Sequence, residues 1–132
     1  MPALPWTSSR TAEPDREYLV LASALPLRRF RTTPRFMLLV MQVRRQLAGA
    51  PGLVGYSLDA RPLARRYWTL SVWEDQDALA RFVAANPHAT AMTRLRPHMG
   101  TTRFTTWQLP GSSLPPRWSD ARARLDAESA GR

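Results

Sequence analysis

The chain has 132 residues, enough for one domain with a hydrophobic core and too few for two domains of ordinary size. It contains no cysteine, which excludes disulfides, thiolate metal sites and cysteine nucleophiles, and its two histidines, His88 and His98, lack the spacing of metal ligands. The formal net charge of +9 would suit nucleic acid or an acidic surface, but every basic residue is arginine and isoleucine is absent, a bias typical of GC-rich genomes that weakens this inference.

The first 16 residues are rich in proline, serine, threonine and charge, and they show no hydrophobic periodicity. We therefore expect a flexible N-terminal tail. This segment lacks the basic region and apolar core of a signal peptide, and no later apolar run reaches the length of a membrane span. The sequence thus predicts a cytoplasmic protein without a membrane partner, with one folded domain over residues 17–110.

The domain begins with a strand and a helix. Residues 18–25 have the length and apolarity of a buried strand, which Pro26 ends. Thr33 as a cap and Pro34 at the first helical position then predict a helix over residues 34–48. The glycines and proline at residues 49–52 stop this helix.

The predicted first helix is apolar on more than one side. Its side chains spaced for a core stripe are Phe36, Leu39, Val40, Val43 and Leu47. Met37, Leu38 and Met41 add apolar surface outside that stripe, which a surface helix does not need. Either a second subunit or a ligand cavity covers them, and flexible methionines suit an adaptable cavity wall. The alternative is that Met37 and Met41 fill gaps in the core.

Two strands joined by a short turn follow, at residues 53–60 and 67–73. The first of these strands carries on one face the side chains of Val54, Tyr56 and Leu58. Period-two alternation in the second gives one face with Trp68, Leu70 and Val72, and an opposite face with Tyr67, Thr69, Ser71 and Trp73. The sequence therefore predicts a hairpin whose second strand has one aliphatic face and one aromatic, hydroxylated face.

Acidic residues then introduce a second helix, with Asp75 as the N-cap candidate. Its apolar residues at helical spacing are Ala78, Leu79, Phe82 and Val83. Asn86 and Pro87 form another cap-and-N1 pair, so that His88 lies in the first turn of a short third helix that buries Met92 and Leu95.

The domain ends with a strand over residues 101–109, which carries Phe104 on one face and Arg103, Thr105 and Trp107 on the other. The element order is strand, helix, strand, strand, helix, strand. This predicts an α+β fold, the ferredoxin-like βαββαβ arrangement, with an antiparallel four-stranded sheet and helices on one face. The side chains expected on the uncovered face are Ser57, Tyr67, Thr69, Ser71, Trp73, Arg103, Thr105 and Trp107. Because a monomer seldom exposes such an apolar patch, we expect two sheets to pack face to face in a homodimer.

The stretch LSVWEDQDALARFVAANPHATAM, together with APGLVGYSL, resembles the antibiotic biosynthesis monooxygenase-like family of the dimeric α+β barrel superfamily. The resemblance covers about residues 17–109. It implies a homodimer with a pocket in each protomer between the sheet and the helices. In the enzymes of the family this pocket oxidises polycyclic aromatic substrates with oxygen, without metal or flavin. The resemblance therefore implies a cofactor-independent monooxygenase acting on a small planar aromatic or polyketide-like compound.

The same fold also serves other functions. One alternative is a noncatalytic domain that binds a hydrophobic ligand or only dimerises. Another is a heme-binding oxygenase. The heme degraders of the family carry a tryptophan and a heme-ligating histidine where this chain has Phe82 and Met92, and their first-strand asparagine is absent, since only Ser23 is available. Heme degradation by that mechanism is disfavoured, while heme-linked carotenoid oxygenation stays open.

His88 is the candidate catalytic group, as a base or an orienting group. A neutral imidazole at a helix start has a lowered pKa because the macrodipole opposes its cation, and it could accept a phenolic proton. The alternative is a partly exposed capping residue. The candidate substrate-binding residues are Met37, Met41, Trp68, Trp73, Phe82, Met92, Arg103 and Trp107. The tryptophans would stack on a planar ligand or serve as core and interface residues, and Arg103 would pair with an enolate or carboxylate.

Residues 111–132 form a second tail, rich in proline, serine and arginine. Ser119 or Asp120 could cap a short helix over residues 121–125, which Trp118 and Leu125 would dock across the mouth of the barrel as a lid. The alternative is a disordered end. RNA-recognition domains share the predicted strand order, but their basic-Gly-aromatic signature is missing from the third strand, so we expect no nucleic-acid partner.

Overall fold

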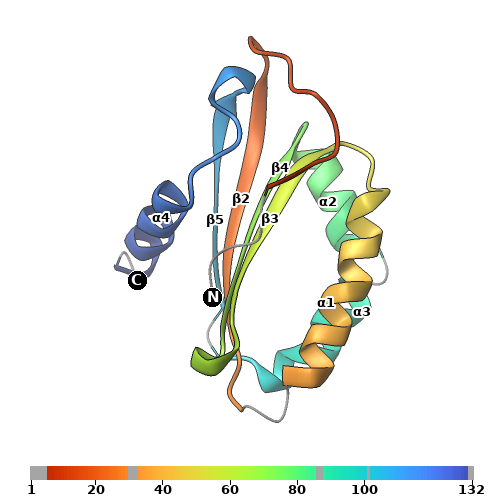
Figure 1. The fold of residues 1–132 in the computed structure, drawn as a ribbon, viewed down its shortest axis with the longest axis vertical. Helices are drawn as coiled ribbons and strands as arrows, with labels where there is room; N and C mark the ends of the chain where they lie inside the picture. Colours follow the sequence, from red (N-terminus) through yellow and green to blue (C-terminus); the bar gives the residue numbers. More distant parts are fainter. Residues whose placement is uncertain (1–5, 30–32, 86–87, 101, 131–132) are drawn as a thin grey trace.

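One antiparallel sheet with helices on both faces forms the fold (Figure 1). The computed structural model describes residues 6–29, 33–85, 88–100 and 102–130. The strands, in the spatial order β1–β3–β4–β2–β5, are β1 (Thr7–Ser8), β2 (Glu17–Pro26), β3 (Leu53–Arg61), β4 (Arg66–Trp73) and β5 (Arg103–Pro110). The α-helices are α1 (Thr33–Ala48), α2 (Gln76–Ala84), α3 (His88–Leu95) and α4 (Trp118–Ala130), and short 3-10 helices are η2 (Pro62–Ala64), η3 (Arg96–His98) and η4 (Gly111–Ser113). The predicted α+β class and the βαββαβ core are confirmed, and the sheet has five strands where four were expected.

The fifth strand comes from the segment expected to be a tail. Thr7 pairs with Tyr56 and Ser8 with Gly55, at the edge of β3. The indole of Trp6 lies directly over Gly55, where a Cβ atom would come within 2.5 Å of the ring. Only glycine leaves room for this contact, so residue 55 fixes how the N-terminal segment crosses the sheet.

Strand β4 alternates as predicted, but its two faces point the opposite way. Tyr67 and Trp73, expected on the uncovered face, pack toward α1 and α2 and are 4% and 1% exposed. Thr69 and Ser71 share their side, while Trp68, Leu70 and Val72 face α4. The hydroxylated face can be buried because its polar groups pair with one another: the Trp73 indole donates to Ser71 Oγ at 2.9 Å, and the hydroxyls of Ser23 and Thr69 are bonded.

Strand β3 also departs from the expected alternation. A β-bulge between Leu53 and Gly55 shifts the register, so that Val54 joins the cluster beneath α4 while Tyr56 packs on the helix side with Leu53. The expectation that Val54 shares a face with Tyr56 is therefore wrong. A glycine inside a strand, here Gly55, often marks such a bulge.

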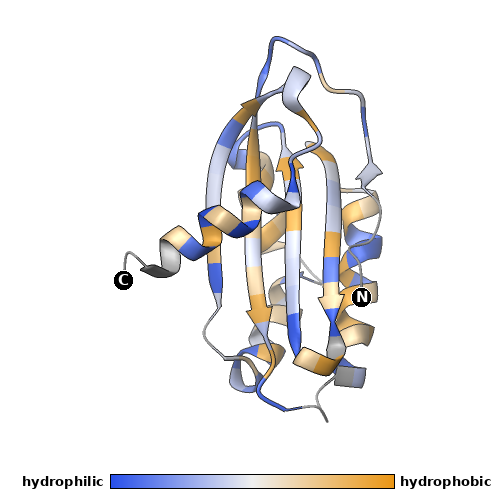
Figure 2. Ribbon diagram, turned by 60° about the vertical axis from the view of Figure 1, so that its left-hand side comes forward, coloured by the Kyte–Doolittle hydropathy of each residue, from blue (hydrophilic) through white to orange (hydrophobic). Residues whose placement is uncertain are grey.

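Helix α4 lies across the sheet face that was expected to be naked (Figure 2). It begins at Trp118 and is longer than the predicted helix over residues 121–125. Ala121 and Leu125 are 0% and 1% exposed and pack on the cluster that includes Val20 and Leu70. The C-terminal helix is therefore ordered and docked, but on the face of its own sheet and not across the mouth of a barrel as expected. Since the chain itself covers this face, the argument that an open aromatic sheet requires a partner copy loses its premise.

Helix α1 has the predicted core stripe, with Phe36, Leu39 and Leu47 buried. Met37, Leu38 and Met41 are 36%, 60% and 48% exposed on its outer side. The methionines therefore do not fill gaps in the core. The side chain of Thr33, its predicted cap, lies outside the described residues. Among the described residues, no helix is long and apolar enough to cross a membrane.

Helices α2 and α3 contact one another and lie on the same side of the sheet as α1 (Figure 1). The Asp75 carboxylate accepts a hydrogen bond from the backbone N–H of Ala78 at 2.8 Å, which confirms the predicted cap of α2. His88 lies in the first turn of α3, as expected, and Leu95 is buried, whereas Met92, which was also expected to be buried, is half-buried. Asn86 and Pro87, the predicted start signal, lie outside the described residues.

Candidate functional site

His88 lies where three helices meet. Its backbone N–H, one of the unpaired donors at the start of α3, donates to Gln46 Oε1 on α1 at 2.9 Å. The amide of the same Gln46 donates to the Phe82 carbonyl on α2 at 3.3 Å. One glutamine side chain thus holds the start of α3 against the end of α2, and with it the position of the imidazole.

The ring nitrogens of His88 have different roles. Nδ1 lies 3.1 Å from the Val83 carbonyl oxygen, which can only accept, so Nδ1 carries the proton and Nε2 the lone pair. Burial lowers the pKa of His88 below its usual 6.5, against the smaller opposing effect of the Val83 carbonyl. The imidazole is therefore neutral at pH 7, with Nε2 able to act as a base. The lowered pKa was predicted, but its largest cause is burial rather than the helix dipole.

Two predicted aromatic residues come together with His88. The Phe82 ring lies 5.1 Å from the imidazole, and the Trp73 ring lies 5.1 Å from Phe82. Trp73 is buried and Phe82 half-buried. Met92, on α3, is half-buried against the neighbouring cluster around Phe36. Trp73, Phe82 and His88 thus form an aromatic row on the helix side of the sheet, with a base at its outer end.

The other predicted site residues lie elsewhere. Trp68, Arg103 and Trp107 are on the opposite face of the sheet, beside α4. Met37 and Met41 are on the solvent side of α1. The sheet separates Trp68, Arg103 and Trp107 from the aromatic row that ends at His88. The candidate residues therefore do not line a single pocket.

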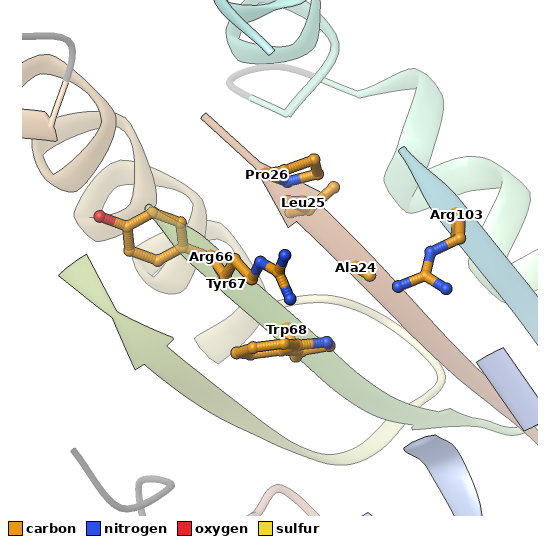
Figure 3. A pocket seen from close by; sticks show the side chains of 7 residues that line it. All are labelled: Ala24, Leu25, Pro26, Arg66, Tyr67, Trp68 and Arg103. Atoms are coloured by element: carbon orange, nitrogen blue, oxygen red, sulfur yellow. The ribbon is translucent and has the colours of Figure 1, made fainter. Parts of the chain in front are cut away.

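A hollow of about 150 Å³ lies at one end of the sheet (Figure 3). It is lined by Ala24, Leu25, Pro26, Arg66, Tyr67, Trp68 and Arg103. Ala24 pairs with Trp68 on β4 and with Arg103 on β5, which brings these side chains to one face. The guanidinium groups of Arg66 and Arg103 turn toward one another across Ala24. Sequence reasoning missed Arg66, although its spacing of two from Trp68 already placed both on one face.

Trp68 is flanked by a charged cluster that sequence reasoning also missed. The guanidinium carbons of Arg61 and Arg122 lie 5.4 and 5.1 Å from its ring centroid. Both arginines pair with Asp59, whose side chain is 2% exposed. Among the described residues Asp59 Oδ1 has no hydrogen-bond partner, nor has the buried hydroxyl of Tyr67 on the other face. The only signal for Asp59 was its spacing of two from Ser57, which placed both on the sheet face expected to be uncovered.

The described residues contain no group of three histidine or acidic side chains arranged to hold a metal ion. The chemistry that the site shows directly is that of a neutral imidazole beside aromatic rings on one face of the sheet. The other face offers two neighbouring guanidinium groups, those of Arg66 and Arg103, beside the indole of Trp68.

Comparison with known families identifies the domain. The model of DUF3291, a domain of unknown function, matches residues 41–130. The chain belongs to the DUF3291 family. The matched span runs from within α1 to the end of α4, so the C-terminal helix is part of the DUF3291 domain. No curated protein sequence matches the chain.

Solved structures share the fold at low sequence identity. SnoaB, a cofactor-independent oxygenase from Streptomyces nogalater, is 21% identical, with a TM-score of 0.60 over 76% of this chain and 99% of SnoaB. A Caulobacter crescentus CB15 protein provisionally named an antibiotic biosynthesis monooxygenase is 17% identical, with a TM-score of 0.61 over 70% of this chain and 89% of that one. Protein SO0527 from Shewanella oneidensis is 12% identical, with a TM-score of 0.62 over 80% and 97%. The expected resemblance to the monooxygenase-like family is confirmed at the level of the fold.

Proposed function

We propose that this DUF3291 protein is a cofactor-independent monooxygenase that oxidises a small, planar, electron-rich aromatic compound. The observation that carries the proposal is the state of His88: Nδ1 is protonated and held by Val83, and burial keeps the imidazole neutral. Nε2 is then a base beside an aromatic wall. The fold shared with SnoaB supports the proposal, although at 21% identity it conveys only the fold.

The chemistry needs one base and molecular oxygen. His88 Nε2 takes a proton from an activated CH2 or hydroxyl group of the substrate, which leaves a delocalised anion and an imidazolium. The anion gives one electron to O2, and the radical pair combines to form a carbon-bound peroxide. The imidazolium returns its proton to the peroxide, and loss of the second hydrogen on that carbon releases water. The sum is a CH2 group plus O2 giving a carbonyl plus water.

The aromatic row would place an apolar ring against the bound substrate. Phe82, which packs on the buried Trp73, provides an apolar surface next to the base, and a delocalised anion loses less solvation free energy there than a compact charge would. We place the substrate ring against Phe82, within reach of Nε2. Met92, further along α3, would border the same ligand.

The proposal includes a homodimer. Its basis is the set of apolar side chains that remain exposed, and no longer an uncovered face of the sheet. Apolar side chains that the described structure leaves exposed include Leu38, Met41 and Phe104, at 60%, 48% and 62%. A second copy that covers them would reduce the apolar surface in contact with water. Analytical ultracentrifugation at micromolar concentration tests this part, and a single species of about the 15.0 kDa chain mass would refute it.

Oxygen uptake with anthrones and quinols tests the enzyme. We expect wild type to exceed the spontaneous rate, and His88→Gln, which keeps a similar size, to lose on the order of a hundredfold or more of this excess. His98→Gln removes the other histidine, at the end of η3, and is the matched control; it should keep the wild-type rate. The wild-type rate should fall as the pH drops through the pKa of His88, which burial places below 6.5.

Equal rates for wild type and His88→Gln would refute His88 as the base. A wild-type rate no higher than the spontaneous one would refute the monooxygenase proposal and favour the noncatalytic alternative, in which the same aromatic row only binds a hydrophobic ligand.

A further inference from the structure

The hollow beside α4 has a surplus of positive charge. Its lining includes two guanidinium groups, Arg66 and Arg103, and no carboxylate. Among the described residues Arg66 forms no ion pair, and Arg103 has only Asp126, at 3.8 Å, a side chain that is 79% exposed. Such a contact in water contributes little. Both guanidinium groups are therefore available to an anion, and Figure 3 shows them converging across Ala24.

One wall of the hollow is a flat aromatic ring held in a fixed position. Arg61 and Arg122 lie over the Trp68 indole, and the buried Asp59 carboxylate pairs with both of these arginines. Asp59 and Trp68 are direct cross-strand partners in β3 and β4. The Asp59 carboxylate thus offsets one of the two positive charges that orient the indole, and among the described residues it pairs with neither Arg66 nor Arg103.

The floor and size of the hollow limit what fits. Ala24 and Pro26 give it an apolar floor. Its volume of about 150 Å³ is below the roughly 300 Å³ at which pockets for drug-sized ligands begin. A single aromatic ring is of suitable size, and a polycyclic compound is not.

We propose that this hollow is a binding site for a small planar organic anion, a single-ring aromatic carboxylate. The carboxylate accepts hydrogen bonds from Arg66 and Arg103, and the ring stacks on Trp68 above the floor formed by Ala24. The site is separated from His88 by the sheet, so it is distinct from the proposed catalytic site and does not depend on it. The recognition requires both a negative charge and a flat ring.

Calorimetric titration with benzoate tests the site. Acetate keeps the charge without the ring, and benzamide keeps the ring without the charge; we expect both to bind at least tenfold more weakly than benzoate. Arg103→Gln should weaken benzoate binding by about tenfold or more, because a charge-assisted hydrogen bond is lost. Arg81→Gln, an exposed arginine on α2, is the matched control and should bind as wild type does. His88→Gln should also leave the benzoate affinity unchanged, which separates this proposal from the proposed function.

A second readout locates the ligand without relying on affinity. In a proton–nitrogen NMR spectrum each indole N–H gives its own signal, and Trp68→Phe identifies the signal of Trp68. Benzoate should shift that signal and leave the signal of Trp73, on the opposite face, in place. The proposal is overturned if wild type fails to bind millimolar benzoate, if acetate binds as well as benzoate, if Arg103→Gln binds benzoate as wild type does, or if Trp73 shifts and Trp68 does not.

Discussion

Truncation of Leu125 to alanine should destabilise the protein, because this side chain anchors α4 to the sheet. Leu125 is 1% exposed and packs in the same cluster as Ala121, Val20 and Leu70. Leu→Ala changes in cores cost about 2–5 kcal/mol, depending on how far the surroundings relax. A terminal helix can shift to fill part of the cavity, so we place the loss near the lower end, at about 2–3 kcal/mol.

Thermal and urea unfolding followed by circular dichroism measure this loss. With roughly 4 °C of Tm per kcal/mol for a domain near this size, the Tm should fall by roughly 8–12 °C. Leu38→Ala is the matched control: it removes the same atoms from α1 at a position that is 60% exposed, and it should change stability by less than about 0.5 kcal/mol. Equal losses for the two variants would show that α4 is not docked on the sheet.

Three further predictions concern single contacts. The free energy of unfolding should decrease as the pH falls below 6.5, because the pKa of His88 is lower in the folded protein and the unfolded chain therefore binds the proton more tightly. In urea unfolding measured at several pH values, His88→Gln should remove this part of the pH dependence. An unchanged pH dependence would count against a buried imidazole. Gly52→Ala should destabilise by more than about 1 kcal/mol, since residue 52 has a φ of +82° and its Cβ would meet Ala78 Cβ at 2.4 Å; wild-type unfolding would contradict this backbone geometry. Asp59→Asn and Arg122→Gln should show a coupling energy of about 1 kcal/mol or more in a double-mutant cycle, and additive effects would mean that the pair does not form.

The elements themselves could be predicted because their signals are local. The helix-start signal at Asp75, the proline at residue 34 and the period-two alternation of β4 each act within a few residues, and the structure has α2, α1 and β4 at these places. The order of these elements then restricts the topology to few choices, of which the ferredoxin-like sheet is one.

The direction of each sheet face could not be predicted from alternation. Both faces of β4 are buried, one under α1 and α2 and the other under α4, so hydrophobicity does not distinguish them. The hydroxyls of Thr69 and Ser71 suggested a solvent-facing side. Their partners, Ser23 and the Trp73 indole, satisfy them inside the protein, and one of these partners lies 46 residues away in sequence. The bulge before Gly55 moved Val54 to the other face, and here the glycine was a local signal that strict alternation ignored.

The candidate site was predicted in part for the same reasons. The position of His88 at the start of α3 follows from local sequence, and the stacking on Phe82 follows from the short connection between α2 and α3. The grouping of Asp59 with Arg122 joins residues 63 apart and depends on the docking of α4. No local pattern contains that information.

The docking of α4 connects the stability of the domain with both proposals. Arg122 lies on α4 and contacts the Trp68 ring and Asp59, so the geometry of the hollow depends on α4 being in place. The same helix occupies the sheet face on which a second copy would otherwise pack. A barrel formed by two sheets face to face therefore requires α4 to leave its own sheet, which would remove Arg122 from the ring of Trp68. A dimer that keeps α4 on its own sheet, and with it the contact of Arg122 with Trp68, has to form through another surface, such as the exposed side of α1.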